Sequence, residues 1–476
     1  MKFLFFALDT ATYRAIIDLN LHANAAGHEC ETLVYTRNKP LEEKIVKRYE
    51  ELEIPHFISR AFLPVSPREF FKNKNLRAET SLIDKVLISG FYVILRIFRR
   101  IDSLRKKTRE GFFGRNGSRM LSYYLTLLAD HATAAEIFEE HKVDALVLSH
   151  DYVGHFSSIL SKIAKKKNIP VVIVPALFTV PEQILRMYQD RPELQIETKM
   201  EKKVARKSPE WTMEANPHTG RYVLRLEWWR IVLLKRLKLS PKHPWVHHSN
   251  DYVDYICLPD NRMRDKYVRL GFDPNRLKVT GSGTRERILA KMAAQKQKIH
   301  KEPLLSVALP PDQFVKDGSN FRHKCLDSQL KELVCVLETV RPSYDILLML
   351  HPKEDPDKYQ LLKNAGFKFA KRDTAEIIPE TDIYLSYIGS STNEWAYWAG
   401  VPNVQWDIYG YLDDAQPRDF RNGVIKAVDG GELKAALEKL TNAEFRNEIK
   451  PIPLASPSNG NKQSYFEQVL VLIASI

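Results

Sequence analysis

The segment DIYLSYIGSSTNEWAYWAGVPNVQWD, residues 382–407, decides the fold. Its apolar run up to Ile388 predicts a buried strand, and the polar turn at 389–392 ends that strand. Residues 393–400 then predict a short helix that stops at a glycine, and a second apolar strand follows at VPNVQWD. A strand–helix–strand unit of this kind indicates a parallel sheet within an α/β fold.

The same alternation extends outward in both directions. Apolar runs that predict strands, separated by segments with helical spacing, recur at FLFFAL (3–8), VDALVLSH (143–150), IPVVIVPAL (169–177), RLKVTGSG (276–283), LLSVALP (304–310) and YDILLMLHP (344–352). Strands that are apolar along their whole length suit parallel sheets covered by helices on both faces. We therefore expect an α/β protein.

The length of 476 residues exceeds one ordinary core and suggests two large domains. The polar, proline-bearing stretch SPKHPWVHHSND (240–251) is the best boundary between them. We predict an N-terminal domain over 1–240, a linker over 241–251, a C-terminal domain over 252–460 and a final helix over 461–476.

Composition narrows the function classes. A net charge of +13 suits nucleic acid, anionic lipid or a phosphorylated substrate, because each presents negative charge to Lys and Arg. No zinc-finger, RNP or helix-turn-helix pattern is apparent, so nucleic acid is not the expected partner. The four cysteines form no C-x-x-C pair, and His243, His247 and His248 lack an obvious carboxylate partner, so no metal site is predicted.

Localisation follows from two patterns. The first apolar run is too short for a signal peptide or a membrane span, which favours a cytoplasmic protein. Residues 82–107 and 225–239 combine large apolar side chains with many Lys and Arg. Such segments are either helices that pack on the core with a solvated basic face, or helices that lie on an anionic membrane surface. Both interpretations stay open, and peripheral attachment to the inner face of the membrane is one expectation.

The turn after the strand at 383–388 is the strongest candidate for a phosphate site. Ser390, Ser391 and Thr392 carry hydroxyls where a helix begins, and a helix N-terminus offers free N–H groups and the positive end of a dipole. Ligands of open α/β sheets bind beyond the carboxyl ends of the strands. The alternative is that Ser391 or Thr392 only caps the helix.

Two further segments have a similar character. The strand at 344–350 ends in His351, Pro352 and Lys353, where His351 can donate to a phosphate or a nucleobase and Lys353 adds charge. The strand at 276–280 ends in a glycine-rich turn and an arginine, which would let the backbone and a guanidinium approach an anion; its residues are Gly281, Ser282, Gly283, Thr284 and Arg285.

These three elements in this order resemble the C-terminal domain of GT-B glycosyltransferases, in particular the bacterial capsule and surface-polysaccharide group. The resemblance covers about residues 250–430. It extends to CDP-glycerol polymerases, to bacterial sialyltransferases that use CMP-sugars and to non-hydrolysing UDP-N-acetylglucosamine 2-epimerases. It implies two Rossmann-like domains facing an interdomain cleft, with the C-terminal helix returning to the N-terminal domain.

The resemblance also implies site roles. The VTGSG turn (279–283) would face the nucleotide-sugar donor, His351 and Pro352 would touch the nucleotide, and Ser390, Ser391 and Thr392 would hold the donor phosphate. Glu394, which follows that cluster, would bind the ribose. The implied donor is a UDP- or CMP-sugar that binds as a substrate, so no permanently bound cofactor is expected.

An inverting transferase also needs a base for the acceptor hydroxyl. The N-terminal domain is expected to supply it, and the best candidates are Asp151 and His155 in SHDYVGHFSS, followed by Asp9 at the end of the first strand. Each could instead be a helix cap or a structural residue.

The leading hypothesis is therefore a metal-independent glycosyltransferase that transfers a sugar from a nucleotide donor to a polysaccharide or lipid-linked acceptor. A UDP-N-acetylhexosamine 2-epimerase, a CDP-polyol phosphotransferase and a binding protein that retains a degenerate scaffold are the alternatives.

Overall fold

The computed structural model describes residues 1–7, 12–34, 39–58, 112–175, 181–188, 191–216, 221–246, 251–294, 302–312, 322–351, 354–390, 392–408, 423–451 and 464–475. These residues form two compact units. Unit 1 comprises residues 1–280 together with 466–476, and unit 2 comprises residues 281–465.

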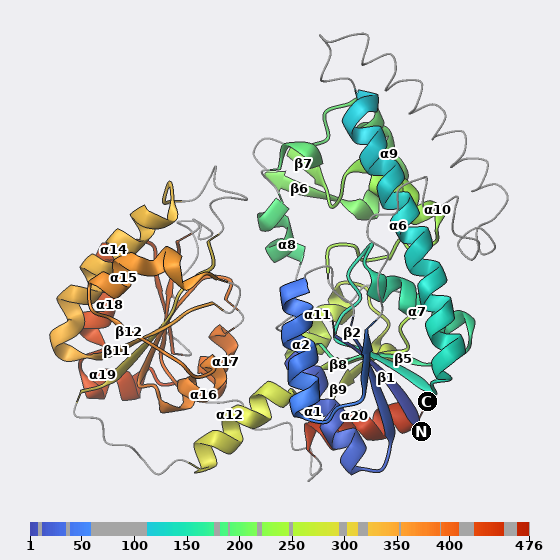
Figure 1. Ribbon diagram of the computed structural model, residues 1–476. Helices are drawn as coiled ribbons and strands as arrows, with labels where there is room; N and C mark the ends of the chain where they lie inside the picture. The colour runs from blue at the N-terminus through green and yellow to red at the C-terminus, as the bar shows by residue number, and fades with distance from the viewer. Residues whose placement is uncertain are drawn as a thin grey trace. The chain divides into compact units, whose positions relative to one another are not determined.

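Unit 1 contains a seven-stranded parallel sheet in the order β3-β2-β1-β4-β5-β8-β9 (Figure 1). Its strands are β1 (Lys2–Ala7), β2 (Glu29–Val34), β3 (His56–Ile58), β4 (Ala145–Leu148), β5 (Val171–Ile173), β8 (Tyr255–Leu258) and β9 (Leu277–Val279). The side chains of β1 from Phe3 to Phe6 are fully buried, and those of β4 are fully buried as well. This is the burial expected of parallel strands covered on both faces.

The helices α1 (Thr12–Ala25), α2 (Lys39–Glu51), α7 (Phe156–Lys166) and α11 (Asn261–Arg269) contact the strands of this sheet, and α6 (Phe112–His141) packs on α7. The helix α10 (Trp228–Arg236) packs on α6, α9 (Lys199–Lys207) packs on α10, and α8 (Pro181–Tyr188) contacts a strand outside the sheet. The helix α7 shows why they form, because Phe156, Ile159, Leu160 and Ile163 recur at helical spacing and all enter the core beside β1 and β4. A small antiparallel pair, β6 (Thr212–Asn216) and β7 (Arg221–Leu224), lies outside the main sheet.

The structure divides the chain later than the sequence predicts. The strands β8 and β9, which the sequence analysis assigned to the C-terminal domain, continue the sheet of unit 1: β8 pairs with β5 and β9 pairs with β8. The physical reason is that β5 would otherwise leave an unpaired edge, and backbone pairing with β8 satisfies it. The boundary therefore lies between Thr280 and Gly281, not at 241–251.

The second basic apolar segment (225–239) packs on the core. In α10 the side chains of Trp229, Ile231 and Leu234 are at most 4% exposed, and Trp229 joins a cluster with Leu121 and Leu125 of α6. Most of its apolar side chains are thus used inside the protein, whereas Val232 is 45% exposed. The first basic segment (82–107) lies outside the described residues.

Unit 2 contains a six-stranded parallel sheet in the order β12-β11-β10-β13-β14-β15. The strands are β10 (Leu304–Ala308), β11 (Asp345–Met349), β12 (Lys368–Phe369), β13 (Ile383–Tyr387), β14 (Asn403–Trp406) and β15 (Val424–Ala427). The helices are α12 (Gly283–Ala294), α14 (Leu326–Val340), α15 (Gln360–Asn364), α16 (Thr374–Ile377), α17 (Asn393–Trp398), α18 (Gly430–Lys439) and α19 (Ala443–Glu448).

The strands of unit 2 alternate between two apolar clusters, one on each face of the sheet. In β13, Ile383 and Leu385 join the cluster that contains α14 and α18, whereas Tyr384 joins the cluster that contains α12, α16 and α17. Successive side chains of a strand point to opposite faces, so this division follows directly from the two-residue period. Figure 1 shows α14 and α18 on one side of this sheet and α16 and α17 on the other.

The last helix, α20 (Tyr465–Ala474), returns to unit 1 for most of its length. The ring of Phe466 stacks on the His22 ring of α1 with centroids 4.1 Å apart. Val469 and Ile473 of α20 are fully buried. The apolar spacing of the C-terminal segment is therefore explained by burial on one face of the helix.

Candidate functional site

The sheet of unit 2 has a topological switch point beside β10. The strands β11 and β12 are added on one side of β10, and β13 is then added on the other side. The carboxyl ends of parallel strands lie at one edge of the sheet, and ligands of open α/β sheets bind there, where the strand order reverses. The residues that follow β10, β11 and β13 therefore define the candidate site.

A cluster of hydroxyls follows β13. The Tyr384 hydroxyl donates to Oγ1 of Thr392 over 2.6 Å, and Oγ of Ser390 lies 2.7 Å from the same Oγ1. Thr392 occupies the N-cap position of α17, yet its side chain makes no capping hydrogen bond. The capping alternative thus does not describe Thr392 in this structure. Ser391 lies outside the described residues.

The phenols beneath this cluster stay protonated. Burial raises the pKa of Tyr384 well above its usual range, and burial raises the pKa of Tyr387 to about 12 despite the contact of Tyr387 with Ser390. Gly389 precedes the cluster with φ of +91°, a backbone conformation that side chains other than glycine rarely adopt. The turn therefore presents neutral hydroxyls on a backbone bend that requires glycine.

Buried amides fix the turn in place. The Ser386 hydroxyl contacts the side-chain carbonyls of Asn393 and Asn403, and it lies 2.9 Å from that of Asn403. The Asn403 amide donates to the Asn393 carbonyl over 3.1 Å, and the Asn393 amide donates to the Tyr387 carbonyl over 3.2 Å. These bonds join β13, α17 and β14. The sequence patterns above did not predict these bonds, although a serine and an asparagine inside otherwise apolar strands indicate buried hydrogen-bonding groups.

His351 follows β11 at the same edge. It is half-buried, and its carbonyl accepts a 3.0 Å hydrogen bond from the Glu354 N–H. Two strand spacings separate β11 from β13, a span of about 10 Å. The structure thus brings His351 to the same edge as Ser390 and Thr392. Pro352 and Lys353 lie outside the described residues.

The glycine-rich segment at 281–285 is placed differently from the prediction. It follows β9, a strand of the unit 1 sheet, so it does not extend from a strand end of the unit 2 sheet. Gly281 has φ of +91°, Arg285 is 7% exposed, and α12 begins at Gly283. The Arg285 N–H donates to Ser282 Oγ over 3.5 Å, and Arg287 donates to the Thr284 hydroxyl over 3.4 Å.

This segment nevertheless approaches the helix of the hydroxyl cluster. Ile288 of α12 is fully buried in the same apolar cluster as Ala396 of α17 and Ala399, the residue that follows α17. The helix α12 therefore links the 281–285 segment to α17 by packing rather than by strand order. Glu394, at the start of α17, is half-buried.

The sheet of unit 1 has its own switch point. The strands β2 and β3 lie on one side of β1, and β4 lies on the other. Asp151 follows β4 and His155 stands at the N-cap of α7 without a side-chain capping bond. Asp9 follows β1 in sequence, but it lies outside the described residues. The structure therefore places Asp151 and His155 in one loop at this edge.

The two candidates in that loop differ in exposure. Asp151 is 1% exposed, and its charge adds to burial in raising the pKa of Tyr267 in α11. His155 is exposed, with the Tyr152 ring 5.5 Å away. Gly154 between them has φ of +72°, and a Cβ there would collide with the Tyr123 hydroxyl. The loop is thus shaped around a glycine, with a buried carboxylate and a surface imidazole.

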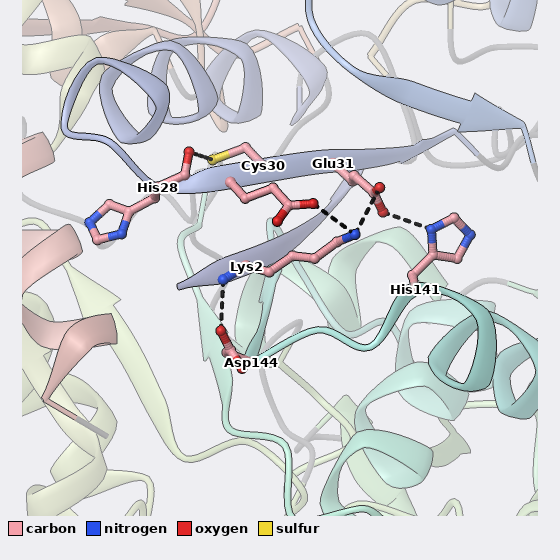
Figure 2. A network of polar contacts seen from close by, with 7 residues as sticks. Lys2, His28, Cys30, Glu31, His141 and Asp144 are labelled. Carbon is pink, nitrogen blue, oxygen red and sulfur yellow. Dashed lines mark hydrogen bonds and ion pairs between the residues drawn. The ribbon is translucent and has the colours of Figure 1, made fainter.

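The opposite edge of this sheet carries a charge network. Lys2 Nζ lies 3.0 Å from carboxylate oxygens of both Glu29 and Glu31, and His141 Nδ1 lies 2.7 Å from Glu31 (Figure 2). The Lys2 N–H also donates to Asp144 over 2.8 Å. These residues lie at the amino ends of β1 and β2, the edge where α/β sheets do not bind ligands. We interpret the network as structural.

Two features are absent from the described ranges. These ranges contain no group of three or more His, Cys, Asp and Glu residues arranged to hold a metal ion. Nor do they contain a helix whose length and hydropathy would carry it across a bilayer.

Comparisons with known proteins identify the fold. No protein-family model and no curated protein matches the sequence. A candidate UDP-N-acetylglucosamine 2-epimerase from Listeria monocytogenes matches with a TM-score of 0.51 and 10% identity over 99% of this chain and 94% of that one. Another UDP-N-acetylglucosamine 2-epimerase matches with a TM-score of 0.50 and 9% identity over 99% of this chain and 94% of that one.

A glycosyltransferase is also among the similar structures. The calicheamicin glycosyltransferase CalG4 matches with a TM-score of 0.47 and 13% identity over 94% of this chain and 92% of that one. Identities this low establish the fold and not the reaction. The chain has two Rossmann-like domains, and its fold resembles that of UDP-N-acetylglucosamine 2-epimerases.

Proposed function

We propose that the protein is a glycosyltransferase that transfers a sugar from a nucleotide-activated donor to a polysaccharide or lipid-linked acceptor. One observation carries the proposal. Ser390 and Thr392 form a hydroxyl cluster at the switch point of the unit 2 sheet, and the Thr392 hydroxyl is not used to cap the helix that follows it. Hydroxyls at such an edge suit a donor phosphate.

The chemistry requires the phosphate to leave as an anion. Neutral hydroxyl donors held in fixed positions stabilise the charge that develops on a leaving phosphate, because they need no reorganisation during the reaction. Tyr384 holds the Thr392 hydroxyl, and Ser386 with its two asparagine partners holds the turn. We assign donor-phosphate binding to Ser390, Ser391 and Thr392, with His351 toward the nucleobase.

The acceptor base is assigned to unit 1. The exposed imidazole of His155 can take a proton from an acceptor hydroxyl, since histidine titrates near neutral pH. Asp151 is buried in the same loop, where it would act by orienting or by stabilising charge rather than by meeting an acceptor at the surface. Asp9 stays a candidate base on the strength of its sequence position alone.

Calorimetry tests the donor site. UDP-, CMP-, CDP- and GDP-sugars are titrated into the wild type, into Ser390→Ala/Thr392→Ala, and into the control Thr339→Ala, which removes an exposed hydroxyl bonded to the Cys335 carbonyl on α14. We expect one donor class to bind and the double variant to weaken it at least about tenfold, as two lost hydrogen bonds predict. Failure of every donor to bind, or equal binding by the double variant, rejects the assignment.

The epimerase is the second candidate, because the similar structures with a TM-score of at least 0.50 carry that description. Incubation with UDP-N-acetylglucosamine and no acceptor separates the two functions. An epimerase converts the sugar under these conditions, whereas a transferase needs an acceptor. Release of CMP from CDP-glycerol or CDP-ribitol would instead identify a polyol phosphotransferase.

We also propose that the acceptor is met at an anionic membrane surface. The helix α9 exposes Lys202, Lys203, Arg206 and Lys207, and none of these four forms an ion pair with another described residue. Basic side chains of this kind are attracted to anionic headgroups by about 1 kcal/mol each. The apolar face of α10 contributes to the core, so the attraction would be electrostatic.

A further inference from the structure

Asp312 lies at the switch point and was not singled out by its sequence. It follows β10, the strand between β11 and β13, by four residues. Its side chain is only 10% exposed, and Oδ2 accepts a 2.9 Å hydrogen bond from Lys358 Nζ. Its other oxygen, Oδ1, is buried and has no hydrogen-bond partner within the described part of the chain.

The segment that carries Asp312 is held from two sides. The Leu309 N–H donates to the Met349 carbonyl over 2.9 Å, which continues the pairing of β10 with β11. The fully buried Tyr359 donates its hydroxyl to the Pro310 carbonyl over 2.8 Å. Lys358 also lies 3.6 Å from the Glu354 carboxylate. The Asp312 carboxylate is therefore held in position. Its Oδ2 atom is hydrogen-bonded to Lys358, and its Oδ1 atom is not hydrogen-bonded to any described residue.

The buried Oδ1 atom of Asp312 needs a hydrogen-bond donor. Leaving a buried acceptor unsatisfied costs about 1–3 kcal/mol, and more when it is charged, so the ion pair with Lys358 does not by itself explain the burial of Oδ1. A carboxylate only accepts hydrogen bonds and repels phosphate. The missing partner is therefore a hydroxyl or an N–H group of a ligand, not its diphosphate.

The strand order indicates which hydroxyl. His351 follows β11, Asp312 follows β10, and Ser390 follows β13, in that order along the edge. If the nucleobase lies toward His351 and the phosphate lies toward Ser390, the part of the nucleotide between them is the ribose. We propose that Oδ1 of Asp312 accepts a hydrogen bond from a ribose hydroxyl of the nucleotide donor. This inference rests on the proposed donor site.

The ligand tests the inference without any mutation. UDP, CDP and GDP are titrated into the wild-type protein, and the tightest of the three is compared with its 2′-deoxy, 3′-deoxy and 2′,3′-dideoxy analogues. A hydrogen bond to a charged acceptor predicts that at least one deoxy analogue binds about tenfold more weakly or worse. Equal affinity for the nucleotide and all three analogues overturns the inference.

Variants locate the effect on Asp312. Asp312→Ala is expected to abolish the discrimination between ribose and deoxyribose. Lys358→Met is the matched control, because it breaks the same ion pair but leaves the carboxylate. It is expected to keep discrimination. Thermal unfolding verifies that each variant is folded, and Asp312→Glu, which displaces the carboxylate by one methylene, replaces the alanine variant if that one does not fold.

The outcomes separate this inference from the proposed function. If no nucleotide binds the wild type, both the proposed donor site and the role of Asp312 are rejected. If nucleotides bind, Ser390→Ala/Thr392→Ala weakens them and Asp312→Ala still discriminates, only the role of Asp312 is overturned. If Glu394→Gln no longer discriminates between ribose and deoxyribose nucleotides while Asp312→Ala still does, the ribose contact belongs to Glu394. That result also overturns the role of Asp312.

Discussion

The hydroxyl of Tyr384 in β13 donates a 2.6 Å hydrogen bond to the hydroxyl of Thr392 at the start of α17. Tyr384 is fully buried and burial keeps its phenol protonated, so the bond has a fixed direction. The same Thr392 hydroxyl lies 2.7 Å from Oγ of Ser390 and makes no capping hydrogen bond to the helix. The core of unit 2 thereby shapes the candidate phosphate site.

Tyr384→Phe should therefore impair binding without unfolding the protein. We expect a loss of about 1 kcal/mol in the free energy of unfolding from the missing hydrogen bond. Nucleotide affinity should fall about three- to tenfold because the Thr392 hydroxyl is no longer held. Tyr344→Phe is the control, since its buried hydroxyl donates to the Leu437 carbonyl over 2.5 Å within the same unit. A similar loss of affinity in both variants would show that stability, not the site, is measured.

His131 should make unit 1 sensitive to acid. Burial, followed by the positive charges of Lys162 and Lys166 on α7, lowers the pKa of His131 to about 4. Between pH 6.5 and 4 the unfolded chain binds a proton that the folded chain does not, so stability falls as pH falls through this window.

His131→Gln removes the group whose proton uptake differs between the folded and unfolded chains. The variant's unfolding free energy should decline less steeply between pH 6.5 and 4, with a cumulative difference on the order of 2 kcal/mol after allowance for solvent screening. Denaturant titrations at several pH values measure it. Parallel pH profiles for the wild type and the variant would refute the prediction.

Glu31 should contribute stability at neutral pH that is lost in acid. Burial alone would raise the pKa of Glu31, but its contacts with Lys2 and His141 outweigh burial and lower the pKa below 4.5 (Figure 2). The stabilisation is complete above the ordinary pKa and disappears as pH falls through the lowered one.

Glu31→Gln should thus cost about 1 kcal/mol at pH 7 and progressively less below pH 4. Glu29→Gln is the matched control, because Glu29 contacts the same Lys2 nitrogen at 3.0 Å but its side chain is 66% exposed. Its expected effect is below about 0.5 kcal/mol, as for a surface pair. Chemical denaturation at both pH values provides the measurement, and a pH-independent effect of Glu31→Gln would contradict the assignment.

The basic face of α9 should control binding to anionic vesicles. Co-sedimentation with phosphatidylcholine vesicles containing phosphatidylglycerol is expected for the wild type and should weaken as salt increases. Lys202→Gln/Lys203→Gln/Arg206→Gln/Lys207→Gln should reduce binding about tenfold or more. A triple change of Lys426, Lys434 and Lys439 to Gln on unit 2 is the control for lowered net charge; it removes three positive charges, against four in the α9 variant. Binding to pure phosphatidylcholine, or an unaffected α9 variant, would reject the electrostatic contact.

Local sequence predicted many of the elements. The apolar runs at 304–310 and 383–388 contain β10 and β13, the run at 3–8 lies one residue later than β1, and the helix predicted over 393–400 contains α17 (Asn393–Trp398). The glycine at 389 was expected in a turn, and its φ of +91° shows why. Such features depend on periodicity and on residues within a few positions of each other, so the sequence alone reveals them.

Long-range contacts decided the rest. The sequence presented 252–260 as the start of a new domain, yet β8 pairs with β5 and extends the first sheet. It left open whether Trp229 lies in a bilayer interface or in the core, and packing against α6 placed it in the core. Which sheet edge a strand joins depends on backbone groups more than 80 residues away, as with Val172 and Tyr255, and no local pattern encodes that choice.

The candidate site likewise combines features that the local sequence determines with features that long-range contacts determine. The amino-acid sequence by itself determined that Ser390 and Thr392 follow a buried strand and precede a helix, because strand and turn chemistry are local. Only the tertiary structure decided that the Thr392 hydroxyl bonds to Tyr384 and that Asp312 stands between His351 and Ser390. The direction of a side chain and the order of strands are set by packing between segments distant in sequence, where burial and hydrogen-bond satisfaction are decided together.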